Sequence, residues 1–197
     1  MSSAEIKTDN LLKHIKTNRG PAPVHDWDPP YCGEMDMRIA ADGRWYHEGS
    51  PIGRKRLVQL FSSILRLDPD GFHYLVTPVE KVRIKVDDCP FVAQLVDVVE
   101  RDGQQVLRFT LNTDEVVEAG PDNPIEVTID ADQQPHPVLE VRHGLKALII
   151  RSVFYSLVEI AETSPVDDKN NKKNNDMEKV LAVSSQGCKF ELGRFQG

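Results

Sequence analysis

The 197-residue chain has no run of apolar residues long enough to cross a bilayer: its longest, ALII at 147–150, is far shorter than the ~20 residues that a spanning helix needs. It also lacks a basic excess, because 24 Lys and Arg stand against 31 Asp and Glu, giving a formal charge of -7. This balance argues against broad, charge-driven binding to nucleic acid or to an anionic membrane. We therefore expect neither nucleic acid nor a membrane as a partner.

Cysteines and catalytic motifs are also scarce. Cys32, Cys89 and Cys188 are odd in number and show no CxxC or Cys/His spacing, which indicates reduced thiols in or near the core. The beginning of the chain has no apolar stretch followed by a small-residue cleavage site, so we expect a cytoplasmic protein. No HExxH or other histidine–carboxylate cluster is present, and no serine lies in a GxSxG elbow. These absences favour a non-enzymatic protein without a metal or a cofactor.

What the sequence does contain is a globular composition, with 40% hydrophobic and 28% charged residues. We predict an α+β fold of two similar halves, each a mostly antiparallel sheet with one main helix. The expected domains are an N-terminal arm with a short helix (1–30), an N-terminal α+β half (31–88) and a β-rich C-terminal half (89–197). In the arm, a helical period is carried by Ile6, Leu11, Leu12 and Ile15.

The N-terminal half begins with an alternating hairpin. MDMRIA and RWYHE, joined by Asp42-Gly43, predict two paired strands. Ser50 occupies an N-cap position with Pro51 after it, so we expect a helix that starts at Ile52 and ends before the DPDG stretch at 68–71. FHYLVT and EKVRIKV predict two further strands, the second with one face exposed.

The C-terminal half begins with a second hairpin, FVAQLVDVV and VLRFTLN joined by RDGQ, and continues with strands at IEVTID and VLEVR. A wide apolar band over residues 144–162 predicts a largely buried helix. A polar stretch at 164–176 is expected to be a mobile loop, and VLAVSSQGCKFELG a closing hairpin. The order strand, helix, hairpin at 35–86 returns at 138–193, with VRIKV answered by CKFEL, which indicates a weak internal duplication.

Four stretches together carry a resemblance to a known family. They are YCGEMDMRIAADGRWYHEGSPIGRKRLVQLFSSIL, LVTPVEKVRIKVDDCPFVA, HPVLEVRHG and IIRSVFYSLVEIA, with GSPI and LVTPVEKV the most specific parts. With them the chain resembles DUF1285, a bacterial family of unknown function. The resemblance implies a duplicated α+β core, a C-terminal half similar to pleckstrin-homology domains, and a pocket between the halves for a nucleotide-like ligand. An insertion at 167–176 departs from the family and affects only the last loop.

The stretch GSPIGR at 49–54 is the first candidate binding element, and from it we take Ser50, Ile52 and Arg54. Unpaired amides at a helix start favour an anion, to which Arg54 would add a bidentate clamp. The alternative is that Ser50 only caps the helix and Arg54 points to solvent, since the P-loop and dinucleotide-binding motifs are missing.

Two further candidates lie on strands or their turns. Arg38, beside Asp36 and close in the chain to Glu34, either forms a cross-strand ion pair on a solvated face or lines a pocket wall with these acids. The turn residues Thr77, Glu80 and Lys81 either form an exposed hairpin corner or offer a hydroxyl, an acid and an amine to a small ligand.

Arg151 is the last candidate. It interrupts an apolar stretch, where an unpaired guanidinium would be costly to bury. Its expected partner is Asp114 or Glu115, in an internal pair, or else the anion of a ligand.

The candidates predict a non-enzymatic regulatory or signal-transduction protein. We expect it to bind a small anionic ligand, of nucleotide type, between its halves, and to have a signalling protein as a further partner. The alternative is a protein-interaction module in which an exposed sheet edge accepts a partner strand, since FVAQLVDVV carries few charges for an edge. A hydrolase or transferase without a recognisable motif is a third hypothesis, which turnover of the ligand would reveal.

Overall fold

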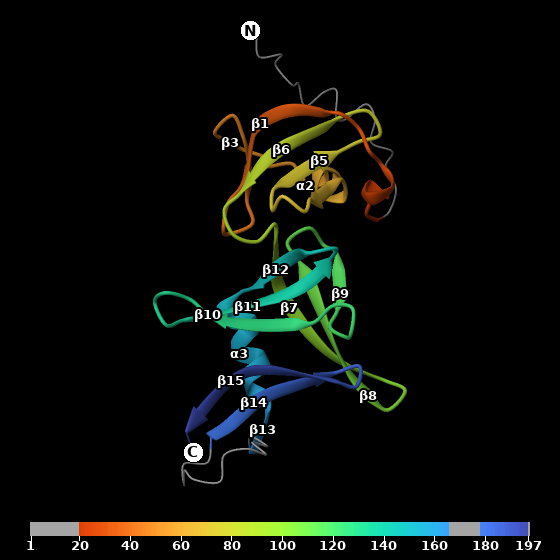
Figure 1. Cartoon of the computed structure of the whole chain (residues 1–197). Coiled ribbons are helices and arrows are strands. Elements are labelled where there is room, and N and C mark those ends of the chain that lie inside the picture. Colours follow the sequence, from red (N-terminus) through yellow and green to blue (C-terminus); the bar gives the residue numbers. More distant parts are fainter. Residues whose placement is uncertain (1–19, 166–177, 197) are drawn as a thin grey trace. The chain divides into compact units, whose positions relative to one another are not determined.

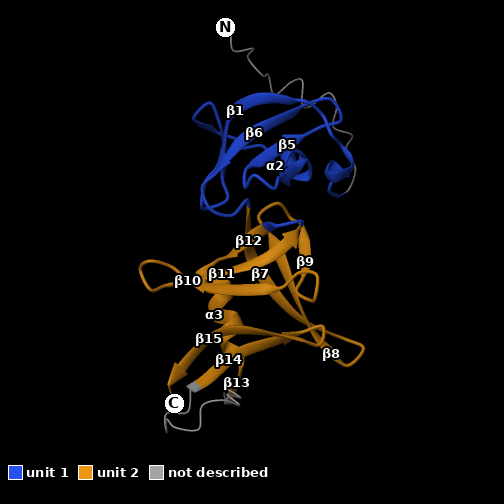
Figure 2. Ribbon diagram, in the orientation of Figure 1, with its two compact units in different colours: residues 1–90, 143–145 blue, residues 91–142, 146–197 orange. Residues whose placement is uncertain are grey.

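The computed structural model describes residues 20–165 and 178–196. The chain divides into two compact units, of which unit 1 comprises residues 1–90 and 143–145, and unit 2 residues 91–142 and 146–197 (Figure 2). The predicted N-terminal helix and most of the predicted loop at 164–176 lie outside the described residues. Among the described helices, none is both long enough and apolar enough to span a bilayer.

In its described residues, unit 1 is built on a six-stranded sheet with one α-helix and one short 3-10 helix (Figure 1). Its elements are η1 (Val24–Asp26), β1 (Tyr31–Ile39), β2 (Trp45–His47), β3 (Ser50–Pro51), α2 (Lys55–Ser63), β4 (Leu65–Leu67), β5 (His73–Val76) and β6 (Lys81–Val86). The strands lie in the order β3-β2-β1-β6-β5-β4. Because only β1 and β6 run parallel, the sheet consists of two three-stranded meanders, β1–β3 and β4–β6, joined by that pair.

The alternating sequences of unit 1 form the expected strands. In β1 every second residue from Met35 to Ile39 is buried, and the predicted hairpin with β2 is confirmed. Trp45 stacks on Phe61 of α2, with ring centroids 6.2 Å apart, so the helix buries its apolar face against the sheet. The helix is shorter than predicted, because Leu65–Leu67 leaves it to pair with β5 as β4.

The described residues of unit 2 form two sheets and one α-helix (Figure 1). Its elements are β7 (Phe91–Arg101), β8 (Gln104–Leu111), β9 (Val116–Glu118), β10 (Ile125–Ile129), β11 (Pro135–Arg142), β12 (Leu145–Ile149), α3 (Arg151–Glu159), β13 (Glu162–Pro165), β14 (Glu178–Ser185) and β15 (Cys188–Gln196). The six-stranded sheet has the order β10-β11-β12-β7-β8-β9, with β12 and β7 parallel, and the second sheet has the order β13-β14-β15.

The two six-stranded sheets share one topology. In each, two successive meanders are joined by a parallel pair between the first strand of the first meander and the last strand of the second. The two halves are therefore similar, but the expected correspondence of VRIKV with CKFEL is wrong. VRIKV lies in β6, which takes the place that β12 takes in unit 2, whereas CKFEL lies in β15 of the separate three-stranded sheet.

The helix expected over 144–162 is also shorter than predicted. Leu145–Ile149 forms β12, which pairs in parallel with Phe91–Ala93, and only Arg151–Glu159 is helical. The apolar band of the sequence combines two periods: Leu145, Ala147 and Ile149 alternate toward one side of a strand, and then Val153, Phe154 and Leu157 line the buried side of a helix. The predicted hairpins β7–β8 and β14–β15 are confirmed.

The three thiols are free, as expected for reduced cysteines. Cys89 is buried and Cys188 half-buried, but Cys32 is exposed at the start of β1, so its expected place in or near the core is wrong.

Candidate functional site

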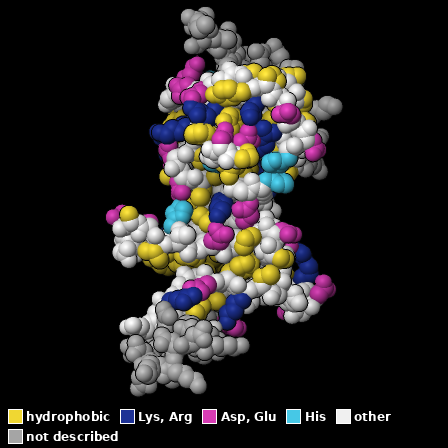
Figure 3. Space-filling view, viewed as in Figure 1, with side chains coloured by type: hydrophobic (Ala, Val, Ile, Leu, Met, Phe, Trp, Pro, Cys, Tyr) yellow, Lys and Arg dark blue, Asp and Glu magenta, His cyan; other side chains and the backbone are white. Residues whose placement is uncertain are grey.

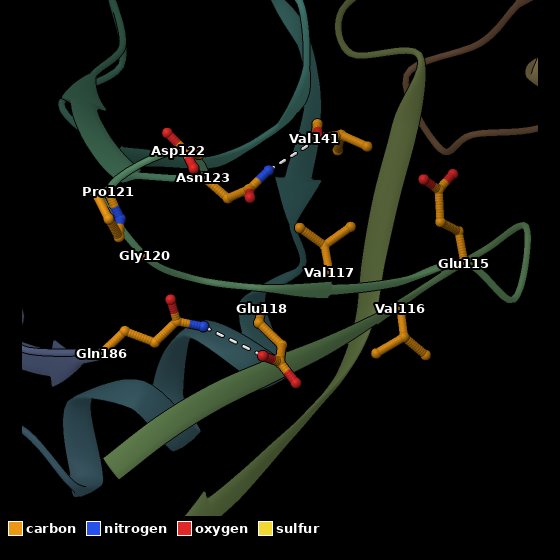
Figure 4. A pocket seen from close by; sticks show the side chains of 10 residues that line it. All are labelled: Glu115, Val116, Val117, Glu118, Gly120, Pro121, Asp122, Asn123, Val141 and Gln186. Atoms are coloured by element: carbon orange, nitrogen blue, oxygen red, sulfur yellow. Dashed lines mark hydrogen bonds between the residues drawn. The ribbon is translucent and has the colours of Figure 1, made fainter. Parts of the chain in front are cut away.

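Unit 2 contains a pocket of about 330 Å³ beside β9 and the turn that follows it (Figure 4). The lining residues are Glu115, Val116, Val117, Glu118, Gly120, Pro121, Asp122, Asn123, Val141 and Gln186. They come from one continuous stretch of chain and from two distant positions, on β11 and at the β14–β15 turn. This volume lies at the lower end of the range of small-molecule sites.

The turn Gly120–Asn123 forms one side of the pocket and is held by reciprocal backbone bonds. The amide of Gly120 donates to the carbonyl of Asn123 (3.1 Å), and the amide of Asn123 donates to the carbonyl of Gly120 (3.2 Å). The Asn123 side chain then donates from Nδ2 to the carbonyls of Glu140 (3.0 Å) and Val141 (2.9 Å), which fixes the turn on β11. The turn is thus part of the rigid sheet framework.

Gln186 lines the pocket next to Gly120. It occupies the β14–β15 turn with φ of +50°, and Gly187 follows with φ of +75°, the conformations of a two-residue hairpin turn. Its amide donates to the carbonyl of Gln105 (2.9 Å), and its side chain donates from Nε2 to Oε2 of Glu118 (3.2 Å). A Cβ on Gly120 would lie 2.5 Å from Gln186 Oε1, so the missing side chain at Gly120 lets Gln186 take this position.

Two of the three acids in the pocket are already paired. Both oxygens of Glu115 accept from Nη1 of Arg142, at 2.6 and 2.7 Å. Glu118 accepts a bidentate pair from Arg101, at 2.8 and 2.9 Å, and these hydrogen bonds are the main cause of its lowered pKa. Asp122 is exposed and has no ion-pair or hydrogen-bond partner for its carboxylate among the described residues.

Most of the side-chain groups that stay available in the pocket are acceptors. They are the Asp122 carboxylate, Oδ1 of Asn123 and Oε1 of Gln186, while both N–H groups of the Asn123 amide and one of the two N–H groups of the Gln186 amide are engaged by the protein. The lining includes no Lys, Arg or His. The pocket therefore suits a ligand that brings its own hydrogen-bond donors, and it disfavours an anion.

The stretch GSPIGR does not begin a helix. Ser50 and Pro51 form β3, which pairs with β2 across a tight turn at Glu48 and Gly49, whose φ values are +49° and +71°. The amide of Ile52 donates to the carbonyl of Trp45 (2.8 Å) and extends this pairing. The predicted N-cap role of Ser50 is therefore wrong, because the hairpin uses the backbone that a helix start would have needed.

The helix begins instead after Arg54, which is its N-cap residue and makes no side-chain capping bond. Arg54, Lys55 and Arg56 are all exposed, and no acid lies in the first turn. Positive charge at this end opposes the helix dipole, so the start of α2 is electrostatically unfavourable as it stands.

Arg38 lies on the exposed face of β1. Its Nε is 3.5 Å from Oδ2 of Asp87, and its guanidinium lies 5.3 Å from the ring centroid of Tyr46. Asp87 directly follows β6, the neighbour of β1, so the pair is the expected cross-strand one, and Glu34 pairs with Arg83. The ion pair on a solvated face is the arrangement observed.

Thr77, Glu80 and Lys81 lie together at the β5–β6 turn. Thr77 is fully buried, and its Oγ1 accepts from the amides of Val79 (3.4 Å) and Glu80 (3.2 Å), which makes it a turn-forming residue. Oε1 of Glu80 is buried without a hydrogen-bond partner among the described residues. Lys81 donates to Asp68 at 2.9 Å.

Arg151 is not a buried cation. It is the first residue of α3 and is exposed, with a long hydrogen bond of 3.4 Å from its Nη2 to Oε1 of Gln134. The internal pair expected with Asp114 or Glu115 is wrong, because Glu115 binds Arg142 and the chain leaves β12 at the surface before the helix starts.

The predicted residues lie on different elements. Thr77, Glu80 and Lys81 share a turn in unit 1, the 50–54 stretch belongs to a different hairpin, and Arg151 belongs to unit 2. None of them lines the pocket. The sequence GPDNP at 120–124, which is typical of a turn, is the one local indication of the pocket. It does not distinguish the rim of a pocket from an ordinary loop.

Comparison with known proteins found two family models and two solved structures that match the chain. The model "Domain of unknown function (DUF1285), N-terminal domain" matches residues 22–89, and "Protein of unknown function (DUF1285), C-terminal domain" matches residues 90–192. A DUF1285 family protein from Silicibacter pomeroyi DSS-3 is 44% identical, with 92% of this chain and 93% of that one covered and a TM-score of 0.78. A second, from Shewanella baltica OS155, is 24% identical over 64% of this chain and 91% of that one, with a TM-score of 0.49. No curated protein matches the chain.

Proposed function

Because the chain belongs to the DUF1285 family, whose name carries no activity, we propose a function from the pocket itself: a non-enzymatic protein that binds a small, donor-rich ligand in unit 2. The ligand class is an amine or a polyhydroxyl compound. One observation carries this proposal, namely that the free side-chain groups of the pocket are acceptors except for one N–H of Gln186.

The arrangement of charges supports an uncharged or positively charged ligand. Glu115 and Glu118 are held by arginines that stand outside the lining, so these acids shape the pocket without leaving their full charge free. Asp122 alone keeps an unpaired carboxylate, which would pair with an ammonium group. Val117 and Val141 add buried apolar surface against which the carbon skeleton of a ligand would pack.

An anionic ligand is a second proposal, for a different place. The exposed cations Arg54, Lys55 and Arg56 at an uncapped helix start would be stabilised by a bound anion. The placement of a ligand between the halves, a signalling role with a protein partner, a cytoplasmic location and the likeness of the C-terminal half to pleckstrin-homology domains all stay predictions.

One titration tests both proposals. Isotope-labelled full-length protein is titrated separately with putrescine, glucose and inorganic phosphate while backbone amide signals are recorded. Putrescine or glucose should shift the amides of residues 115–123 together with those of Val141 and Gln186. Phosphate should leave these signals in place and shift those of residues 54–58.

The control is a matched pair of aspartates in unit 2. Asp122→Asn should weaken putrescine binding about threefold to tenfold, because it removes the unpaired charge and keeps the shape. Asp132→Asn changes an exposed aspartate of the β10–β11 turn, outside the lining, and should have no effect. Equal affinity in the two variants, or pocket amides that respond to neither putrescine nor glucose, would contradict the pocket proposal.

A further inference from the structure

The strand β7 has an edge that the described part of the chain covers only at its beginning. β12 pairs with Phe91–Ala93, whereas β8 pairs with β7 as far as Arg101. From Gln94 to Arg101 the strand therefore has a strand partner on one side only. We call the uncovered backbone of residues 94–101 the open edge.

The geometry of the hairpin determines which groups face outward. Asp102 and Gly103, with φ of +54° and +75°, form the two-residue turn between β7 and β8, so Arg101 and Gln104 exchange backbone hydrogen bonds. The pattern alternates along the ladder, which directs the amides and carbonyls of Val96, Val98 and Glu100 toward the open edge. The hydrogen bonds of β8 show the same alternation. Leu107 and Gln105 lie opposite Val98 and Glu100, and their carbonyls point away from β7, where they accept hydrogen bonds from the amides of Ala119 and Gln186.

Two of the apolar side chains along the open edge are well exposed. Leu95 is 61% and Val98 49% exposed, even though α3 packs against β7. Natural proteins protect such edges with charged side chains, above all lysine, with proline or with a bulge. Residues 94–101 contain three charged side chains but neither lysine nor proline, and the one irregularity in the β7–β8 ladder lies between Ala93 and Leu95, at the beginning of this segment. A regular edge with accessible apolar side chains is a template for another strand.

We propose that the open edge pairs with the open edge of a second copy of this chain, antiparallel, with Val99 opposite Val99 of that copy. The reason for choosing a second copy is the pattern of charges on the strand. Asp97 and Arg101 lie two positions to either side of Val99, so a two-fold axis at Val99 places each Asp97 opposite the other copy's Arg101.

The other registers compatible with the outward-facing groups match less well. A two-fold axis at Asp97 places the two Asp97 carboxylates opposite each other, which is unfavourable. An axis at Val98 places Arg101 opposite Leu95 and leaves Asp97 opposite Val99. Only the axis at Val99 pairs opposite charges.

The neighbouring charges fit the same register. Within one chain Arg101 is held by Glu118 at 2.8 Å, and Asp97 lies directly opposite Arg108 on β8. Pairing through Val99 would extend these ion pairs across the interface. Side chains of alternating charge would then follow one another: Glu118 and Arg101 of one copy, then Asp97 and Arg108 of the second copy. About four backbone hydrogen bonds would form, through Val98 and Glu100 of each copy. Such an interface is small, so the dimer should be weak and concentration-dependent.

Charge exchange tests the register in the full-length protein. Sedimentation is measured from about 10 µM to about 1 mM for wild type, Asp97→Arg, Arg101→Asp and an equimolar mixture of the two variants. Each variant alone places two like-charge pairs in its own dimer and should associate about tenfold more weakly than wild type. In a mixed dimer the introduced arginine faces the introduced aspartate, and the unchanged Arg101 of one copy faces the unchanged Asp97 of the other. Both pairs are then of opposite charge, so association should return to about the wild-type level.

A cross-link gives an independent measurement. Val99→Cys, in a background with Cys32→Ser and Cys188→Ser, should form an intermolecular disulfide on mild oxidation, and Val96→Cys in the same background should not. Circular dichroism checks that each variant is folded. A wild-type chain that stays monomeric throughout the concentration range, or a mixture that associates no better than either variant alone, would overturn the proposal.

Discussion

The strands β1 and β7 occupy the same place in two sheets of the same topology, yet they are covered differently. β1 pairs with its parallel neighbour at both ends of the strand, from Tyr31 to Glu34 and again at Arg38 and Ile39, whereas β7 pairs with its own only over Phe91–Ala93, at its beginning. The position of the helix explains the difference. In unit 1, α2 lies between the two meanders, but in unit 2 the chain leaves the sheet after Ile149 and enters α3. Two sheets with the same strand order can therefore differ in how much of a strand lacks a partner strand on one side.

The two units also differ in how they hold their charges. In unit 1, Arg66 binds Asp68 through two nitrogens, at 2.5 and 3.2 Å, and donates to the carbonyls of Val24 (2.8 Å) and Trp27 (2.9 Å). The Arg66 and Asp68 side chains are 11% and 12% exposed. In unit 2, the Arg101–Glu118 pair is 56% and 26% exposed. In Figure 3, basic and acidic side chains also lie next to each other on the surface of unit 1.

The largest effect should come from removing the buried cation of unit 1. Arg66→Met breaks the pair with Asp68 and the two bonds that hold the segment around η1, so we expect unit 1 to lose about 3 kcal/mol of its unfolding free energy. Both tryptophans of the chain, Trp27 and Trp45, lie in unit 1, so tryptophan fluorescence during urea denaturation reports this unit. Arg101→Met is the matched change in unit 2, and it should leave the denaturation curve measured by circular dichroism nearly unchanged, because the pair is exposed. Equal effects of the two substitutions would contradict the contrast between the units.

A smaller effect, which depends on pH, should come from Asp68. Burial would raise the pKa of Asp68, but hydrogen bonds from Arg66 and Lys81 outweigh it and hold the pKa below its ordinary value of 3.8. A lowered pKa means that the folded state binds the proton less tightly than the unfolded state. The stabilisation is therefore complete well above pH 3.8 and is lost as the pH falls through that value toward the folded pKa.

Asp68→Asn measures this contribution. At neutral pH the variant should be less stable than wild type by about 2 kcal/mol, because a charge-assisted network loses its acid. Urea denaturation at several pH values should show the difference shrinking as the pH approaches 3, where Asp68 of the unfolded wild type is largely protonated. A difference that stays constant down to that pH would show that the charge of Asp68 does not stabilise unit 1.

Strands with a regular two-residue alternation and a clear turn could be predicted from the sequence. The hairpins β1–β2, β7–β8 and β14–β15 are confirmed, since their patterns and turn residues are local. The start of α2 was not predictable in this way. Ser50 and Pro51 are typical of a helix start, and only the pairing of β3 with β2 and the left-handed backbone at Glu48 show that they belong to a hairpin.

Long-range contacts explain the other failures. Leu145–Ile149 becomes a strand because it lies between β11, to which the turn His143–Gly144 joins it, and Phe91–Ala93, a parallel partner that no local pattern reveals. The pocket combines the turn at Gly120–Asn123 with Val141 and Gln186, from separate strands, and its acceptor character depends on which amide groups are already bonded. Such a distribution of hydrogen bonds exists only in the folded chain.

The smallest effect on stability, with a clear effect on binding, should come from Gly120 in the pocket of unit 2. Gly120→Ala places a Cβ 2.5 Å from Oε1 of Gln186, so the flexible Gln186 side chain must turn away and lose its bond to Glu118. Because only a side-chain end moves, the cost should stay below about 1 kcal/mol, while putrescine binding should weaken severalfold. Gly193→Ala, in β15, meets no atom within 4 Å and serves as the control. Adding Gln186→Ala to Gly120→Ala should remove the clash without restoring affinity, because the acceptor at Gln186 is then missing; full recovery of binding would mean that Gln186 acts only as an obstacle.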